Sequence, residues 1–165
     1  MTTTMDQLRQ DSARLKRIFA WLFGIGAFLI FSEITYMPLK ALLFSVGTAD
    51  FADAAGDLGL TALGALPAAA LLGAVWQARR LFETFAGGEI FSGATGRSLT
   101  RLGDWLVISM ALLFLFGPAG ERHDPAFGFY MGTIVMLGCI GLAIRLFGRV
   151  VAMAAAIKHD NDQIV

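Results

Sequence analysis

Four apolar segments, each close to the length that a helix needs to cross a bilayer, constrain this chain more than any other feature. A helix needs about 20 predominantly apolar residues to span a hydrocarbon core of about 30 Å. The segments lie at about residues 18–37, 58–76, 99–116 and 128–147. The third has a short apolar centre, so that Leu99 to Asp104 must be recruited to reach span length. We therefore predict a single all-α domain over residues 1–165, an integral membrane four-helix bundle.

The composition supports this class and excludes others. The chain is 56% apolar and 16% charged, against about 45–50% and 25% in soluble domains. Its 13 basic and 13 acidic residues cancel, whereas a nucleic-acid binder usually carries a basic excess, so we expect no direct nucleic-acid partner. The single cysteine, Cys139, excludes an intrachain disulfide framework and multi-cysteine metal sites. We expect no cofactor and no bound metal.

Basic residues are distributed unevenly between the segments that connect the spans. The positive-inside rule counts lysine and arginine on each side of the membrane and places the richer side in the cytoplasm. Lys40 and Arg122 fall on one side. The other eleven fall on the opposite side: Arg9, Arg14, Lys16, Arg17, Arg79, Arg80, Arg97, Arg101, Arg145, Arg149 and Lys158. We therefore predict that the amino and carboxyl termini are both cytoplasmic.

The segment after the first span has an apolar start and an acidic end. Pro38 is expected to end the span, because proline cannot continue a helix interior. The apolar residues that follow are expected to lie in the interface plane. Asp50, Asp53 and Asp57 are spaced to share one helical face. That face is either a solvated surface or a mouth that attracts cations.

The cytoplasmic segment from 77 to 104 is the most patterned part of the chain. The pattern at its start predicts a short helix that continues span two. Gly87 and Gly88 are expected to end this helix. Glycines at 93 and 96 lower the helix propensity between Ser92 and Leu99. The segment lacks the Gly-Lys-Ser/Thr ending of a phosphate-binding loop. Its candidate partner-binding residues are an aromatic, a glycine, two apolar anchors and a predicted helix N-cap: Phe85, Gly88, Ile90, Phe91 and Ser92.

The fourth span is expected to continue as an amphipathic cytoplasmic helix within the tail, residues 148–165. Leu146, Val150, Met153 and Ile157 follow one another at steps of four, three and four residues, which places them on one helical face. This face either packs against other cytoplasmic segments or lipid, or docks a cytosolic partner. Val150, Met153 and Ile157 are therefore further candidate partner-binding residues.

Charged residues within spans are functional candidates by default. Glu33 lies near the outer end of span one, and Arg145 near the inner end of span four. The sequence offers no mid-membrane carboxylate pair and no Ser-His-Asp set on one side of the membrane. We therefore predict that the protein is not an enzyme.

Two stretches of the chain form a recognisable pattern. The first contains Leu81, Phe82, the run from Phe85 to Ser92, Leu99 and Gly103, and the second, in the tail, contains Ala154 to Ile157 followed by Asp160 to Val165. With these residues the chain resembles a bacterial four-helix membrane family that is catalogued only as a domain of unknown function, the two-nine-seven-five family. The resemblance implies four spans, cytoplasmic termini, the bacterial inner membrane and no established activity. It also implies genes beside those of small helix-turn-helix regulators.

Two functions remain as hypotheses. The first is a non-enzymatic module that binds or regulates a protein partner, such as a cytosolic regulator, through its cytoplasmic loop and tail. The alternative is a small oligomeric transporter or channel, with Glu33 and the acidic outer loop near a pore. Small residues recur every four positions at Ala65, Ala69 and Gly73, which favours close packing within one bundle or between copies of the chain. Membrane lipid is the remaining expected partner.

Overall fold

The computed structural model describes residues 2–88, 92–117 and 125–162, and every element in them is helical. The elements are helix α1 (Thr2–Ile34), the π-helical turn η1 (Thr35–Leu39), and helices α2 (Lys40–Phe44), α3 (Phe51–Ala86), α4 (Gly93–Phe116) and α5 (Pro125–Asp162). Among the described residues, four helices are long and apolar enough to cross a membrane. The prediction of an all-α protein with four spanning helices is confirmed.

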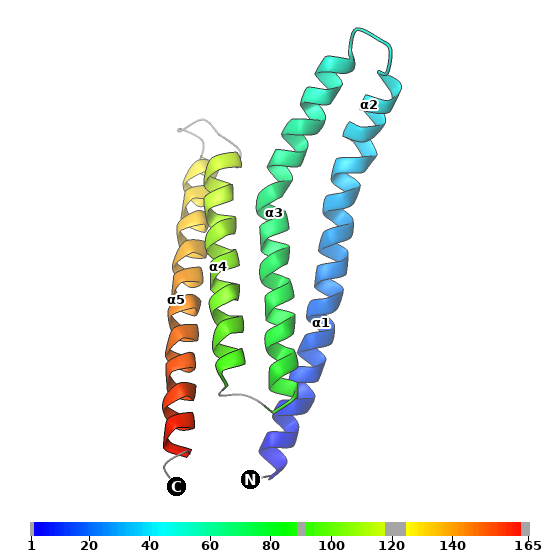
Figure 1. Cartoon of the computed structure of the whole chain (residues 1–165). Coiled ribbons are helices and arrows are strands. Elements are labelled where there is room, and N and C mark those ends of the chain that lie inside the picture. The colour runs from blue at the N-terminus through cyan, green and yellow to red at the C-terminus, as the bar shows by residue number, and fades with distance from the viewer. Residues whose placement is uncertain (1, 89–91, 118–124, 163–165) are drawn as a thin grey trace.

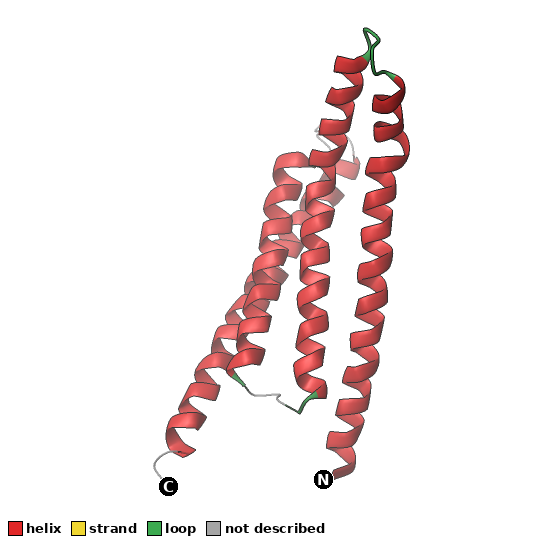
Figure 2. Ribbon diagram, turned by 45° about the vertical axis from the view of Figure 1, so that its right-hand side comes forward, coloured by secondary structure: helices red, strands yellow, loops and turns green. Residues whose placement is uncertain are grey.

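The four long helices stand side by side in an open row (Figure 1). α1 packs on α3, α3 on α4, and α4 on α5, while within the described residues the backbone of α1 approaches neither α4 nor α5. In a view turned by 45°, α1 again lies beside α3, and α5 crosses behind α4 (Figure 2). The row therefore has two broad faces and two free edges, and α5 forms one of these edges.

α4 and α5 pack closely because glycines face each other at their crossing. A Cβ atom added to Gly103 would lie 2.5 Å from the Gly141 carbonyl oxygen, and one added to Gly148 would lie 2.6 Å from the Thr100 nitrogen. Such contacts are possible only where side chains are absent, as in membrane helix pairs that pack through small residues. α4 begins at Gly93, immediately after the predicted N-cap Ser92, so the helix extends before the predicted start of span three at Leu99.

Pro38 does not end the first helix, contrary to the sequence-based prediction. It lies in the π-helical turn Thr35–Leu39, and α2 follows without a break. Proline removes one backbone N–H and its ring crowds the carbonyl four residues earlier. A π-helical turn shifts hydrogen bonding to the fifth residue and so accommodates the ring. α2 therefore continues along α1 and packs on α3 instead of lying in the interface plane (Figure 1).

Proline is also accommodated inside α3. Pro67 lies on the buried side of the helix, and the carbonyl oxygen of Pro67 accepts a hydrogen bond from the Ser109 hydroxyl of α4 at 3.0 Å. The Ser109 side chain is fully buried. This bond joins the two central helices of the row at mid-span.

Both terminal helices extend beyond the predicted spans. α5 runs on to Asp162, which confirms the predicted helical continuation of the tail. α1 begins at Thr2, so the segment before the first span is also helical, which the sequence analysis did not predict. The two termini and the α3–α4 connection lie at the same end of the row (Figure 1).

Candidate functional site

The end of the row that holds both termini is also its basic end. The first half of α1, the last part of α3, the first part of α4 and the second half of α5 meet there (Figure 1). These segments contain all eleven basic residues that the sequence analysis assigned to one side. Lys40 lies in α2 at the opposite end, and Arg122 lies outside the described residues. We call this region, with its eleven lysines and arginines, the basic end.

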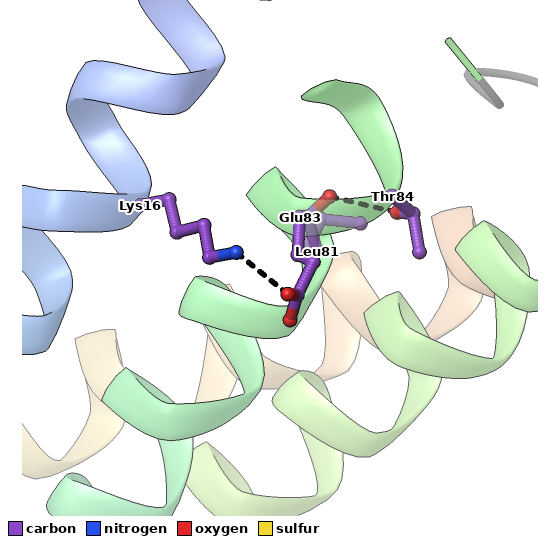
Figure 3. A network of polar contacts seen from close by, with 4 residues as sticks. All are labelled: Lys16, Leu81, Glu83 and Thr84. Atoms are coloured by element: carbon purple, nitrogen blue, oxygen red, sulfur yellow. Dashed lines mark hydrogen bonds and ion pairs between the residues drawn. The ribbon is translucent and has the colours of Figure 1, made fainter. Parts of the chain in front are cut away.

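α1 and α3 are joined at the basic end by aromatic pairs and an ion pair. The ring centroids of Phe23 and Trp76 lie 5.1 Å apart, and those of Phe19 and Phe82 lie 5.3 Å apart. One turn further, Lys16 Nζ donates to Glu83 Oε1 at 2.6 Å (Figure 3). Glu83 lies beyond the predicted end of span two at residue 76. The hydrogen bond from Lys16 and its positive charge lower the pKa of the Glu83 carboxyl below 4.5.

This ion pair predicts a small dependence of stability on pH. Because the pKa of Glu83 is lowered in the folded state, its contribution is present above the ordinary value of 4.5 and is lost as pH falls through the folded value. Glu83→Gln should therefore lower the melting temperature by roughly 1–3 °C at pH 7, since the pair is largely exposed. The difference between the two proteins should shrink steadily as pH is lowered from 4.5 and vanish below the folded value. Thermal unfolding in detergent over a series of decreasing pH values measures this, and a difference that does not change with pH would contradict it.

The candidate residues of the α3–α4 connection already have structural roles. The half-buried Phe85 ring meets that of Phe82 edge to face, with centroids 6.2 Å apart. Gly88 has a φ of 85°, which confirms the predicted helix break. Ser92 Oγ accepts a hydrogen bond from the Thr95 backbone nitrogen at 3.2 Å, which confirms the predicted N-cap. Ile90 and Phe91 lie outside the described residues.

The apolar stripe of the tail is exposed. Val150, Met153 and Ile157 are 49%, 61% and 63% exposed, whereas Val151 is only 6% exposed. At 100° per residue, the stripe lies on the side of α5 opposite Gly148, which faces α4. We call the stripe of Leu146, Val150, Met153 and Ile157 the free face of α5.

The two candidate intramembrane charges differ in their surroundings. Glu33 is exposed on α1. Arg145 Nε lies 3.1 Å from Asp104 Oδ1 of α4, and both side chains are about two-fifths exposed. Sequence reasoning treated Asp104 and Arg145 separately and missed this ion pair. The sequence did contain a signal for this ion pair. Spans three and four are consecutive and therefore antiparallel, and each of the two residues lies near the end of its span on the same side of the membrane.

Three acidic residues at the start of α3 and just before it gather at the opposite end of the row. Asp50, Asp53 and Asp57 line a shallow hollow of about 430 Å³ between α2 and α3. The expected shared face is therefore present. Within residues 2–88, 92–117 and 125–162, no three His, Cys, Asp or Glu side chains are grouped so that they could hold a metal ion.

A family model described as "Protein of unknown function (DUF2975)" matches residues 7–165. No match was found among curated proteins or among solved structures.

Proposed function

The chain belongs to the DUF2975 family of proteins of unknown function, and from this premise we propose that it is a non-enzymatic protein of the bacterial inner membrane that binds a partner protein through the free face of α5. The eleven basic residues at the end that holds the termini support cytoplasmic termini by the positive-inside rule. The partner is then a cytosolic or membrane-bound protein that reaches this end, such as a regulator.

The exposure of Met153 and Ile157 carries the proposal. Within the bilayer, lipid covers apolar side chains, so exposed residues there need no partner. Ile157 lies ten residues beyond the predicted end of span four at residue 147, or about 15 Å further along a helix. The headgroup region adds only about 5–8 Å on each side of the hydrocarbon core. Ile157 and Met153, both more than three-fifths exposed, therefore extend an apolar surface toward water.

The shape and charge of α5 indicate the partner's chemistry. Apolar residues at steps of four and three match an amphipathic helix that lies alongside α5 with its own apolar anchors at the same steps. Where the free face enters the membrane, Leu142, Arg145, Leu146 and Arg149 line a hollow of about 240 Å³. Arg145 already pairs with Asp104, so the Arg149 guanidinium beside this hollow favours a carboxylate on the partner helix.

A photo-crosslinking experiment in cells tests the proposal. A photoreactive residue at Ile157 should give a discrete adduct with one protein. Met153→Glu should reduce the adduct at least tenfold, because a charge in the centre of an apolar contact costs more than about 1.4 kcal/mol. Ala156→Glu, a charge at an exposed position off the stripe, is the matched control and should leave the adduct unchanged. Equal adducts in both variants, or adducts with lipid alone, would refute the proposal.

A second copy of the chain is the other occupant that this experiment must distinguish. Cys139 is the only cysteine and is exposed, and it lies on the same side of α5 as the free face by helical periodicity. Oxidative cross-linking of Cys139 should leave the protein monomeric if a different protein binds there. An efficient disulfide dimer would favour the homo-oligomer, the arrangement that the transporter or channel hypothesis requires.

A further inference from the structure

One face of the row contains an apolar groove between α1, α3 and α4. Its volume is about 640 Å³, within the range of about 300–1,000 Å³ typical of small-molecule sites. Phe23 and Ile34 of α1, Leu72 and Trp76 of α3 and Trp105 of α4 are among its walls. Gly73 shapes it, because a Cβ atom there would lie 2.6 Å from the Trp105 ring. Without that Cβ, the indole lies directly over α3.

The groove runs along the helices from the predicted membrane boundary nearest the basic end. On α3 its walls run from Gln77 to Ala69, eight residues or about 12 Å of helix, which is most of the roughly 15 Å of one leaflet. On α1 they run from Phe23 to Ile34, which lies near the predicted outer end of span one. Phe23 pairs with Trp76, at the predicted end of span two. The groove therefore begins at that boundary and extends to about the middle of the bilayer on α3 and beyond it on α1.

Unpaired polar groups lie at the boundary end of the groove. Gln77 lines the groove, is only 9% exposed, and its Oε1 is buried without a hydrogen-bond partner. The guanidinium carbons of Arg79 and Arg80 lie 4.6 Å and 5.8 Å from the centroid of the Trp76 ring. Arg79 Nε is also buried without a hydrogen-bond partner. A buried polar group without a partner is costly, so these groups indicate a ligand with polar atoms at this end.

We propose that the groove binds one anionic phospholipid from the leaflet at the basic end. One acyl chain lies along the groove, and the phosphate lies beside Trp76, where the guanidinium groups of Arg79 and Arg80 donate to it. The Gln77 amide bonds to the glycerol region, where ester carbonyls and hydroxyl groups are available. The nearby Glu83 carboxylate already accepts from Lys16, so the two arginines leave a net positive charge for the phosphate. Arginine suits this role because its planar donors match phosphate oxygens.

Tryptophan fluorescence can measure this occupancy directly. The chain has three tryptophans, and in a Trp21→Phe variant only the two that line the groove, Trp76 and Trp105, remain. This variant is reconstituted in phosphatidylcholine bilayers that contain increasing mole fractions of a lipid with brominated acyl chains, which quench tryptophan on contact. Brominated phosphatidylglycerol should reach half-maximal quenching at about a tenth of the mole fraction that brominated phosphatidylcholine needs.

Arginine variants distinguish binding at a specific site from nonspecific contact with the surrounding lipid. In the same background, Arg79→Gln with Arg80→Gln should abolish the preference for the anionic lipid while quenching at high mole fraction persists. Arg97→Gln, an exposed arginine of the basic end on α4, should keep the preference. If the double variant fails to fold, Arg80→Gln alone replaces it in the test, because Arg80 is exposed. This single variant should reduce the preference for the anionic lipid.

Two results would overturn the proposal. Identical quenching curves for the anionic and zwitterionic lipids would show only bulk lipid in the groove. Absence of quenching by either lipid would show that a protein segment or a second copy fills it.

Discussion

Alanine at Gly103 or Gly148 is expected to destabilise the protein strongly, although alanine is the smallest possible replacement. At Gly103 the added Cβ would lie 2.5–2.8 Å from the Gly141 carbonyl oxygen and from the backbone nitrogen and Cβ of Arg145. At Gly148 it would lie 2.6–2.8 Å from backbone and side-chain atoms of Thr100 and from the Gly96 carbonyl oxygen. These are mainly backbone atoms, which cannot rotate away as a flexible side chain can. α4 and α5 must therefore move apart.

The expected loss is about 1–3 kcal/mol for each variant, the usual cost of overpacking. This corresponds to a decrease of roughly 3–10 °C in melting temperature for a chain of this size. Thermal unfolding in detergent, followed by circular dichroism, measures the change. Gly128→Ala and Gly132→Ala on α5 are matched controls, because a Cβ at either position meets no atom beyond its own stretch of helix within 4 Å. The controls should be neutral or up to about 1 kcal/mol more stable, since alanine favours helix. Equal losses of stability in all four variants would contradict the close packing of α4 against α5 through glycines.

The spacing of these glycines shows what the sequence could have revealed about the fold. Gly96 and Gly103 are seven residues apart on α4, and Gly141 and Gly148 are seven apart on α5. A seven-residue repeat indicates a seam between two helices. Considered without its neighbours, Gly96 only lowers the helix propensity before Leu99. A glycine lowers the stability of an isolated helix, but it is favourable where the backbone of another helix passes close to it. Which of these two effects is larger depends on the neighbouring helix.

The number of spans and the separation of charge were predictable because each depends on local sequence. Span length follows from apolar runs, and the basic end follows from the positions of lysine and arginine along the chain. The open row was not predictable. The four long helices are only weakly amphipathic, so the same hydrophobic pattern is compatible with a closed bundle and with an open row. Pro38 was misjudged because the cost of proline in a helix depends on whether the chain can form a wider turn there, as it does over Thr35–Leu39.

The candidate site was predicted in part for a related reason. The tail stripe is a local helical pattern, so Val150, Met153 and Ile157 were found from spacing alone. Their exposure depends on which side of α5 meets α4, and this required the structure. The groove could not be found from the sequence, because Phe23, Gln77 and Trp105 come from three helices. Its clearest local signal is a glutamine between Trp76 and Ala78, at the end of an otherwise apolar span.

Breaking the ion pair between Asp104 and Arg145 is the second change with a large expected effect. The pair joins α4 to α5 next to Gly103, whose missing side chain lets Asp104 come within 3.1 Å of Arg145 Nε. An isolated surface pair contributes about 0.2–1 kcal/mol, and removing one partner of a fully buried pair costs about 3–5 kcal/mol. Both side chains here are about two-fifths exposed. Arg145→Gln should therefore cost about 1–2 kcal/mol, because it leaves the Asp104 carboxylate unpaired near the membrane boundary.

A double-mutant cycle separates this pairing from the loss of the arginine itself. Asp104→Asn alone should destabilise the protein as Arg145→Gln does, since each variant leaves one charge without its partner. Combining them removes both charges and leaves two amides that can still hydrogen-bond, so the double variant should regain most of the loss. Arg149→Gln, at an exposed arginine one turn further along α5, controls for net charge and should change nothing. If the losses from Asp104→Asn and Arg145→Gln simply add, the two residues are neighbours without a stabilising interaction, and α4 and α5 are held together by their glycine crossing alone.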